Sequence, residues 1–240
     1  MKDSVFNIFK SIGLILLVLF FSSLMFGIFN LNPNGMSQTM YLVYMSIFDF
    51  ILLGIYFCIY RRDLIRDFKS YFKDFGKNFE TSFKYWLVGF IIMVVSNIII
   101  VFGLGRSIAN NEEVVRSYID VAPLLMVFCT CIYAPIVEEI TFRKSIREAI
   151  NNKWVYVFVS GFIFGFLHIA SSISDVYDLL YLIPYSSLGC AFALLYYKTN
   201  NIFSSICVHA MHNFLSVIIY ILLGGMLWKD LLDFFLFSFW

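Results

Sequence analysis

The sequence APLLMVFCTCIYAPIVEEITFR, residues 122–143, decides the class of fold. The fourteen residues before its two glutamates are almost wholly apolar, and a helix that crosses a bilayer needs about 20 predominantly apolar residues. The chain is therefore predicted to be an all-α, polytopic membrane bundle with seven or eight transmembrane helices. The comparable apolar runs lie near residues 11–30, 39–60, 85–105, 154–172, 177–197 and 202–224.

The composition of the whole chain supports this class. Apolar residues make up 61% of the 240 residues and charged residues only 14%, against about 45–50% and about 25% in soluble domains. A soluble globule of this size has no room to bury so much apolar surface. Soluble, disordered, nucleic-acid-binding and disulfide-rich secreted proteins are thereby excluded. The five cysteines lie in apolar runs and are interpreted as small buried hydrophobes.

Lys and Arg alternate between the two ends of successive apolar runs. Cytoplasmic loops of membrane proteins carry the excess of these residues. We therefore expect a multi-pass protein of the cell membrane with its N-terminus in the cytoplasm. The ends rich in Lys and Arg are 2–10, 61–84 and 143–153, and the ends poor in them are 31–38, 106–120 and 173–176.

Two further segments relate to the membrane surface. Residues 61–84 interleave apolar with basic side chains, which predicts an amphipathic helix on the inner leaflet rather than a solvated loop. Residues 231–240 form an apolar piece that is short for a full crossing. We expect that piece to be either an eighth, short span or an interfacial helix.

Two adjacent carboxylates, Glu138 and Glu139, end the quoted stretch. A charge at the bilayer centre costs about 2.5–3.5 kcal/mol. Arg143 follows Glu139 by four residues and faces it on a helix, whereas Glu138 lies about 100° away around the axis. Arg143 is therefore expected to neutralise Glu139 and to leave Glu138 free for chemistry, after a bend at Pro135. The alternative is an ordinary charged helix end at the membrane surface.

All three histidines of the chain also lie within apolar runs. His209, His212 and Asn213 share one run, and His168 ends another. Counted from the nearest basic ends, Glu139, His168 and His209 lie about 12, 22 and 16 Å deep. Helix tilt can absorb this spread, so we predict one polar cavity that opens to the cytoplasm. Taken singly, each histidine has the alternative of a structural role.

Asp49 lies midway along the second apolar run. A structural hydrogen bond to another buried polar group, such as Asn97, is the preferred interpretation of such a residue.

Several intramembrane chemistries are excluded by their motifs. The chain has no His-Glu-x-x-His, no Gly-x-Ser-x-Gly, no Gly-Asp dipeptide and no phosphate-binding glycine loop. Carboxylate, imidazole and amide groups remain. A carboxylate in an apolar cavity gains affinity for protons and can act as a general base, while imidazole and amide groups can donate hydrogen bonds to an oxyanion. This set of groups suits the hydrolysis of an amide bond.

Three motifs together carry a resemblance to a known family. They are Glu138-Glu139-x-x-x-Arg143, Phe164-x-x-x-His168 and His209-x-x-x-Asn213, in this order and on separate predicted helices. The chain thus resembles the CAAX-protease and bacteriocin-processing (CPBP, or Abi) family of intramembrane proteases over roughly residues 120–215. Residues 1–110, which include segment 61–84, would be N-terminal transmembrane helices, and residues 111–240 a CPBP-like catalytic helical core.

The resemblance implies a role for each motif residue. Glu138 and His168 would activate a water, His209 and Asn213 would stabilise the oxyanion, and Glu139 with Arg143 would support them. The substrate would be a membrane-associated peptide or protein, within the lipid bilayer. Eukaryotic relatives trim prenylated proteins, and bacterial relatives are linked to maturation of peptide signals or bacteriocins and to self-immunity. The compact chain is more similar to the bacterial type.

Two functions from other classes compete with the protease. A non-catalytic membrane scaffold or bacteriocin self-immunity protein would keep the fold but has no need of all six motif residues. A proton-coupled transporter would use Glu and His as a proton relay, but it is expected to show repeats or broken helices in both halves, and the sequence contains no repeat.

A bound metal is the remaining alternative for the site. Carboxylates and imidazoles are the right ligand types for zinc, but no recognised zinc spacing is present. Asn213 is a poor zinc ligand and a good oxyanion donor. No cofactor is therefore favoured; if zinc is present, Glu138, His168 and His209 are its expected ligands. His212 lies outside the three motifs and is interpreted as a supporting or packing residue.

Overall fold

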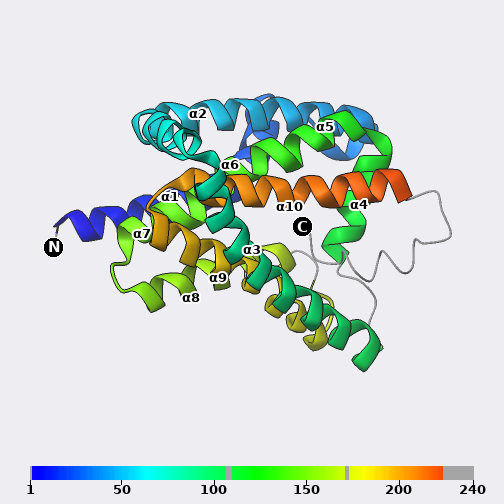
Figure 1. Cartoon of the computed structure of the whole chain (residues 1–240). Helices are drawn as coiled ribbons and strands as arrows, with labels where there is room; N and C mark the ends of the chain where they lie inside the picture. The colour runs from blue at the N-terminus through cyan, green and yellow to red at the C-terminus, as the bar shows by residue number, and fades with distance from the viewer. Residues whose placement is uncertain (1, 106–109, 171–172, 224–240) are drawn as a thin grey trace.

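The structure, a computed structural model, describes residues 2–105, 110–170 and 173–223. Within these residues the chain is all-helical (Figure 1), and six helices are long and apolar enough to cross a membrane. A seventh apolar helix, α8 (Lys153–Ile169), is shorter, with 17 residues. The predicted polytopic helical membrane fold is confirmed. The piece predicted at 231–240 lies outside the described residues.

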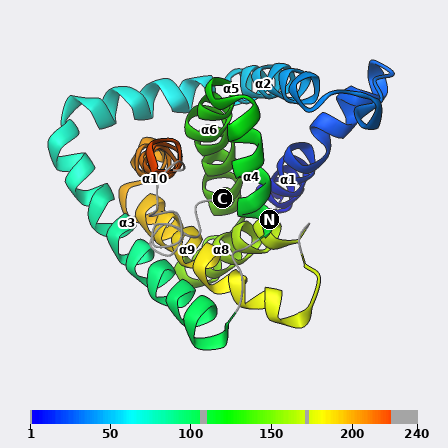
Figure 2. The same cartoon turned by 90° about the vertical axis from the view of Figure 1, so that its right-hand side faces the viewer.

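The helices follow the predicted apolar runs. The other long ones are α1 (Lys2–Ile28), α2 (Gln38–Lys73), α3 (Phe75–Ile98, continued by the π-helix η2, Ile99–Gly103), α9 (Leu182–Thr199) and α10 (Ile202–Leu223). Short elements connect them: η1 (Pro33–Gly35), α4 (Asn110–Val121) and η5 (Val176–Tyr181). Figure 2 shows α2 and α3 diverging from their junction, with α10 in the angle between them.

The span that carries the glutamates is built from five pieces. These are α5 (Pro123–Phe128), the π-helix η3 (Cys129–Tyr133), α6 (Ala134–Glu138), the π-helix η4 (Glu139–Ser145) and α7 (Ile146–Ala149). Proline lacks the backbone N–H that an α-helix needs. Just before Pro135 the helix is wound as a π-turn, in which the Ala134 N–H donates to the Cys129 carbonyl. Such π-turns are frequent at functional sites.

Glycines set how closely α8 and α9 approach each other. A Cβ atom at Gly161 would collide with Cys190, and one at Gly165 would collide with Ser186. Small residues four apart allow two helix backbones to come into contact in a membrane. The Gly161-x-x-x-Gly165 face therefore fixes α8 against α9 and places the end of α8, with His168, beside the core.

Segment 61–84 differs from its prediction. Its residues do not form a separate surface helix, because α2 continues to Lys73 and α3 begins at Phe75. No proline or glycine interrupts residues 55–73, so the helix has no reason to stop at the end of the apolar run. Tyr60, Leu64, Asp67 and Tyr71 form one buried face that continues the packing of α2.

The basic ends of the helices meet at one end of the bundle. Lys10 of α1 lies 2.8 Å from Glu148 of α7, and Lys144 of η4 lies 2.9 Å from Asp63 of α2. The other end carries the α4 and η5 connections (Figure 1). The basic ends that alternate along the sequence thus lie together at one end of the folded bundle.

Large apolar side chains cover much of the outer surface. Leu124 is 84% exposed and Phe9 is 68% exposed, among many others. Exposed apolar surface on this scale is characteristic of a protein that faces lipid.

Candidate active site

Glu139, Arg143 and His209 form a buried cluster at the centre of the fold. Arg143 Nε donates to Glu139 Oε2 at 3.1 Å, as the spacing of four residues predicts, and both side chains are 0% exposed. His209, from α10, lies with Nδ1 at 2.9 Å from Glu139 Oε1. Because a carboxylate paired with arginine can only accept, His209 donates through Nδ1–H. Its Nε2 atom is therefore the unprotonated nitrogen of the neutral ring.

Glu138 differs from Glu139 in its exposure and in its hydrogen bonds. Its side chain is 20% exposed, and its Oε2 atom lies 3.8 Å from His209 Nε2. Within the described residues this oxygen has no hydrogen-bond partner. A separation of 3.8 Å is too long for a direct hydrogen bond but is bridged readily by one water molecule. The structure thus leaves Oε2 of Glu138 without the hydrogen bonds that hold both oxygens of Glu139.

His168 reaches the same region from the end of α8. Its Nδ1 atom lies 2.7 Å from the carbonyl oxygen of Phe164, and since a carbonyl can only accept, Nδ1 carries the proton. The ring stacks on Tyr185, with centroids 5.2 Å apart. The rings of His168 and His209 both contact Phe164. In their neutral forms both histidines therefore have Nε2 as the unprotonated nitrogen.

Phe164 holds the two histidines and the arginine in place. Its ring centroid lies 4.3 Å from that of His168 and 5.9 Å from that of His209. The Arg143 guanidinium carbon lies 4.5 Å from the same ring, a distance at which a cation is attracted to an aromatic face.

Asn213 lies one helical turn beyond His209 on α10. Its Nδ2 atom donates to the carbonyl of Thr130 at 2.8 Å, which anchors α10 to the π-helix η3. The side chain is 1% exposed, and its Oδ1 atom has no hydrogen-bond partner within the described residues. Asn213 therefore shares the face of α10 with His209 but is held by the backbone of the opposite helix, not by another motif residue.

Two polar residues outside the motifs, His212 and Asp49, are buried. Trp86 Nε1–H donates to His212 Nδ1 at 3.1 Å, which joins α3 to α10 and supports the interpretation of His212 as a packing residue. Asp49 is buried within the bundle, at 8% exposure. Its burial is compatible with the structural role expected for it.

Sequence reasoning missed Ser160. Its Oγ atom accepts from Arg143 Nη1 at 3.2 Å and donates to the carbonyl of Phe142 at 2.7 Å. A serine among the apolar residues of α8 was the available signal, because a polar group at this depth needs partners. Ser160 thus satisfies part of a guanidinium that is out of contact with water.

Glu138, His168 and His209 are the residues expected to bind zinc, if zinc is present. Hydrogen bonds from Nδ1 that leave Nε2 free are what supporting partners impose on zinc-binding histidines. However, in the part of the chain that the structure describes, no three His, Cys, Asp or Glu side chains converge closely enough to hold one ion.

A stretch of the chain that includes these side chains matches a known family. Residues 120–215 match the family described as type II CAAX prenyl endopeptidase Rce1-like. The resemblance predicted from the three motifs is thus confirmed for residues 120–215. This Rce1-like segment contains all six motif residues, and its family is one of membrane proteases.

Three curated relatives extend the comparison. A Bacillus subtilis (strain 168) protein named "Putative membrane peptidase YdiL" is 37% identical over 121 residues, which are 49% of this chain and 46% of that protein. The "UPF0177 protein YxdF" of Lactococcus lactis subsp. lactis (strain IL1403) is 29% identical over 150 residues, 60% of this chain and 81% of that protein. An uncharacterized protein of Mycoplasma capricolum subsp. capricolum is 27% identical over 206 residues, 81% of this chain and 60% of that protein.

The share of this chain that is matched differs between the three relatives. This chain spans about half the length of the B. subtilis relative. No solved structure matches the chain.

Proposed function

We propose that the protein is an intramembrane endopeptidase that cleaves a peptide bond of a membrane-associated peptide or protein. The observation that carries the proposal is the contrast between the two adjacent glutamates. Glu139 is fully buried and engaged by Arg143 and His209. Glu138 is partly exposed, and its Oε2 atom lacks a hydrogen-bond partner in the described structure. A carboxylate without a partner beside a histidine is a suitable general base.

The first step proposed is activation of a water by Glu138 and His168. A water that donates hydrogen bonds to Glu138 and to the Nε2 atom of His168 would have polarised O–H bonds. Its oxygen would therefore be a better nucleophile. His209 Nε2, 3.8 Å from Glu138 Oε2, can take up a proton from Glu138 once the water has reacted. Attack of the water oxygen on the substrate carbonyl carbon then forms a C–O bond as one O–H bond of the water breaks and its proton passes to Glu138. When the C–N bond of the peptide breaks, a proton passes from the site to the nitrogen of the leaving amine.

The second step proposed is stabilisation of the oxyanion by His209 and Asn213. With Nδ1–H directed at Glu139, His209 can donate through Nε2 only after that atom has gained a proton. Its donor role therefore follows water activation, when Glu139 stabilises the imidazolium. Asn213 would donate from its amide group, which the bond to Thr130 orients.

The test is a comparison of the wild-type protein with Glu138→Gln. Proteoliposomes that contain either protein would be incubated with membrane-anchored peptides, and the products identified by mass spectrometry. Glu138→Gln is expected to lower the cleavage rate by about 10²–10⁴-fold, the usual contribution of a general base, without loss of folded protein. Glu80→Gln, which changes an exposed carboxylate on α3 paired with Lys84, is the matched control. Cleavage at the wild-type rate by Glu138→Gln would reject the mechanism.

The same variant separates the protease from its rivals. Peptidomics of cells that carry wild-type protein or Glu138→Gln would reveal the natural substrate as peptides that disappear in the variant. A scaffold or immunity protein would protect or assemble equally well with Glu138→Gln. A transporter would lose proton-coupled flux with no change in any peptide.

The proposed chemistry uses no metal. Purified protein is expected to contain well under one equivalent of zinc by elemental analysis and to remain active after chelation. Zinc at one equivalent per chain, lost together with activity in His168→Ala, would replace this proposal with a metallopeptidase.

The proposed orientation places the basic end of the bundle in the cytoplasm. Single cysteines would be introduced at Ser70 and at Ser117 and labelled with an impermeant reagent in intact cells. Ser117 is expected to be labelled from outside and Ser70 only after permeabilisation, because Ser70 lies among the basic residues of α2. The reverse pattern would invert the protein in the membrane.

A further inference from the structure

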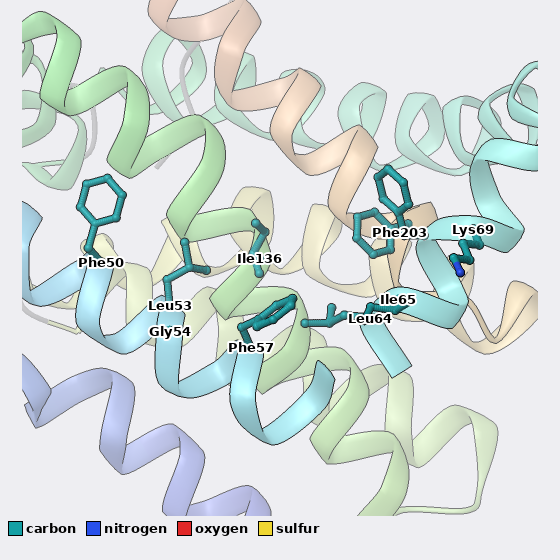
Figure 3. A pocket seen from close by; sticks show the side chains of 10 residues that line it. Phe50, Leu53, Gly54, Phe57, Leu64, Ile65, Lys69, Ile136 and Phe203 are labelled. Carbon is teal, nitrogen blue, oxygen red and sulfur yellow. The ribbon is translucent and has the colours of Figure 1, made fainter. Parts of the chain in front are cut away.

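An apolar groove of about 630 Å³ runs along α2, on the side that faces α6 and α10. Figure 3 shows Phe50 near one end of the groove and Lys69 near the other, with Ile136 of α6 and Phe203 of α10 as its far wall. Among the ten residues that line it, Lys69 alone carries a charge. The groove is therefore a long apolar channel with one cation at its end.

The dimensions of the groove match a single lipid chain. Phe50 and Lys69 are 19 residues apart on one helix, which corresponds to about 28 Å. The volume holds about 20 groups of the size of a water molecule, at about 30 Å³ each. A transmembrane helix is about 10–12 Å in diameter and needs several times this volume. A second copy of the chain or a partner helix is thus too wide for the groove.

The charge of the groove selects the head group. Lys69 is exposed and lies in the basic end of α2, where Arg61 occupies the same helical stripe, four residues after Phe57 and four before Ile65. Basic residues beside an apolar surface bind the phosphate of anionic lipids. The chain of a lipid-modified peptide would fill the apolar part but brings no phosphate to Lys69.

We propose that this groove binds one anionic phospholipid, with an acyl chain along α2 and the phosphate at Lys69. The site is separate from the glutamates and histidines, and it does not depend on the proposed peptidase activity. Its wall includes Ile136, two residues before Glu138, so a bound lipid lies against the helix that carries the proposed base.

Gly54 offers a direct way to close the groove. A Cβ atom at Gly54, which lines the groove, meets no other atom within 4 Å. A large side chain there would project into the groove without displacing the protein. Gly13 of α1 is the matched control, because it is exposed and its Cβ also meets nothing within 4 Å.

The experiment measures lipid retention by native mass spectrometry. The purified full-length protein would be incubated with phosphatidylglycerol or phosphatidylcholine of identical acyl chains. We expect one phosphatidylglycerol to be retained in preference to phosphatidylcholine. Lys69→Gln is expected to lower this preference about fivefold, the effect of one cation near an anionic head group, whereas Lys77→Gln on α3 leaves it unchanged. Gly54→Phe is expected to abolish retention, and Gly13→Phe to preserve it.

Other outcomes would overturn the proposal. Equal retention of the two lipids, or retention unchanged in Gly54→Phe, would show that the groove is not an anionic lipid site. A dimer lost in Gly54→Phe would assign the groove to a second copy, and binding of an acylated peptide in place of phosphatidylglycerol would assign it to a substrate anchor. If Gly54→Phe fails to fold, Ile65→Trp narrows the same groove from an exposed position further along α2.

Discussion

Arg143 and Lys144 are neighbours in η4, yet they belong to two ion-pair clusters of different construction. The buried cluster comprises Glu139, Arg143 and His209, and its Glu139–Arg143 pair is 0% exposed on both sides. The rim cluster comprises Lys144, Asp63, Glu148 and Lys10. Its side chains are between 8% and 32% exposed.

The difference in burial indicates what each cluster contributes to stability and to function. Removing two charges from water costs several kcal/mol per ion, so a buried pair adds little net stability. A rim pair costs less to form and contributes at most about 1 kcal/mol. The buried cluster is therefore better explained by function: Glu139 fixes the proton of His209 on Nδ1, and Arg143 keeps Glu139 ionised for that task.

The largest expected effect follows from breaking the buried cluster on one side. Arg143→Met should lower the free energy of unfolding by about 3–5 kcal/mol, because Glu139 keeps a buried charge without its partner. Unfolding in mixed micelles, followed by circular dichroism, measures the change. A loss below about 1 kcal/mol would show that water or a proton reaches Glu139 and that the cluster is less isolated than its exposure indicates.

Removing both partners sharpens the comparison. The double variant Glu139→Leu with Arg143→Leu should recover most of the stability lost in Arg143→Met, since apolar replacement of a buried pair is often neutral. Its peptide cleavage should nevertheless stay about 10²-fold or more below the wild-type rate, because His209 loses its acceptor. Cleavage and unfolding would be measured on the same preparation. Recovery of both stability and peptide cleavage would mean that the Glu139–Arg143 pair is needed neither for folding nor for catalysis.

The rim cluster should respond much less. Lys144→Met is expected to lower the free energy of unfolding by about 1 kcal/mol, since Asp63 and Glu148 remain hydrated after the change. The loss should shrink as salt is raised, because partly exposed pairs are screened. Repeating the unfolding at low and high salt tests this expectation. A loss of stability as large as that of Arg143→Met would show that the Lys144 ion pairs behave like those of the buried cluster.

The smallest effect is expected at the periphery of the rim cluster. Glu148→Gln removes the charge that pairs with Lys10 at 2.8 Å and with Lys144 at 3.3 Å, while Asp63 continues to pair with Lys144. The Lys10 and Glu148 side chains are 28% and 29% exposed. The expected loss is about 0.5 kcal/mol or less. Because this pair joins α1 to α7, protection of α1 from hydrogen exchange is the more sensitive measurement. Unchanged exchange would show that apolar packing and the remaining hydrogen bonds of Asn7 and Ser11 are sufficient to hold α1.

The sequence predicted those features that depend on one helix at a time. The spans followed from apolar length, and the contact of Glu139 with Arg143 followed from their spacing of four residues. The freedom of Glu138 followed from the same helical geometry. These relations are local, so they need no knowledge of how the helices are arranged.

Relations between helices were not predictable in the same way. Nothing in the spacing of His209 indicated that its Nδ1 atom would meet Glu139 and leave Nε2 toward Glu138. The anchoring of Asn213 by the Thr130 carbonyl likewise depends on the π-turn beside Pro135. Segment 61–84 was expected to be one separate helix, whereas its residues are divided between the end of α2 and the start of α3, because no helix breaker follows the apolar run.

The length of α8 has a consequence for the membrane itself. Its 17 residues extend about 26 Å, whereas the hydrocarbon core of a bilayer is about 30 Å thick. Hydrophobic mismatch of this sign is relieved by local thinning of the bilayer. His168 is the penultimate residue of α8, so head groups and their water are drawn toward the end of the helix at which it lies. Bilayer thickness therefore becomes a variable that sets how readily water reaches this histidine.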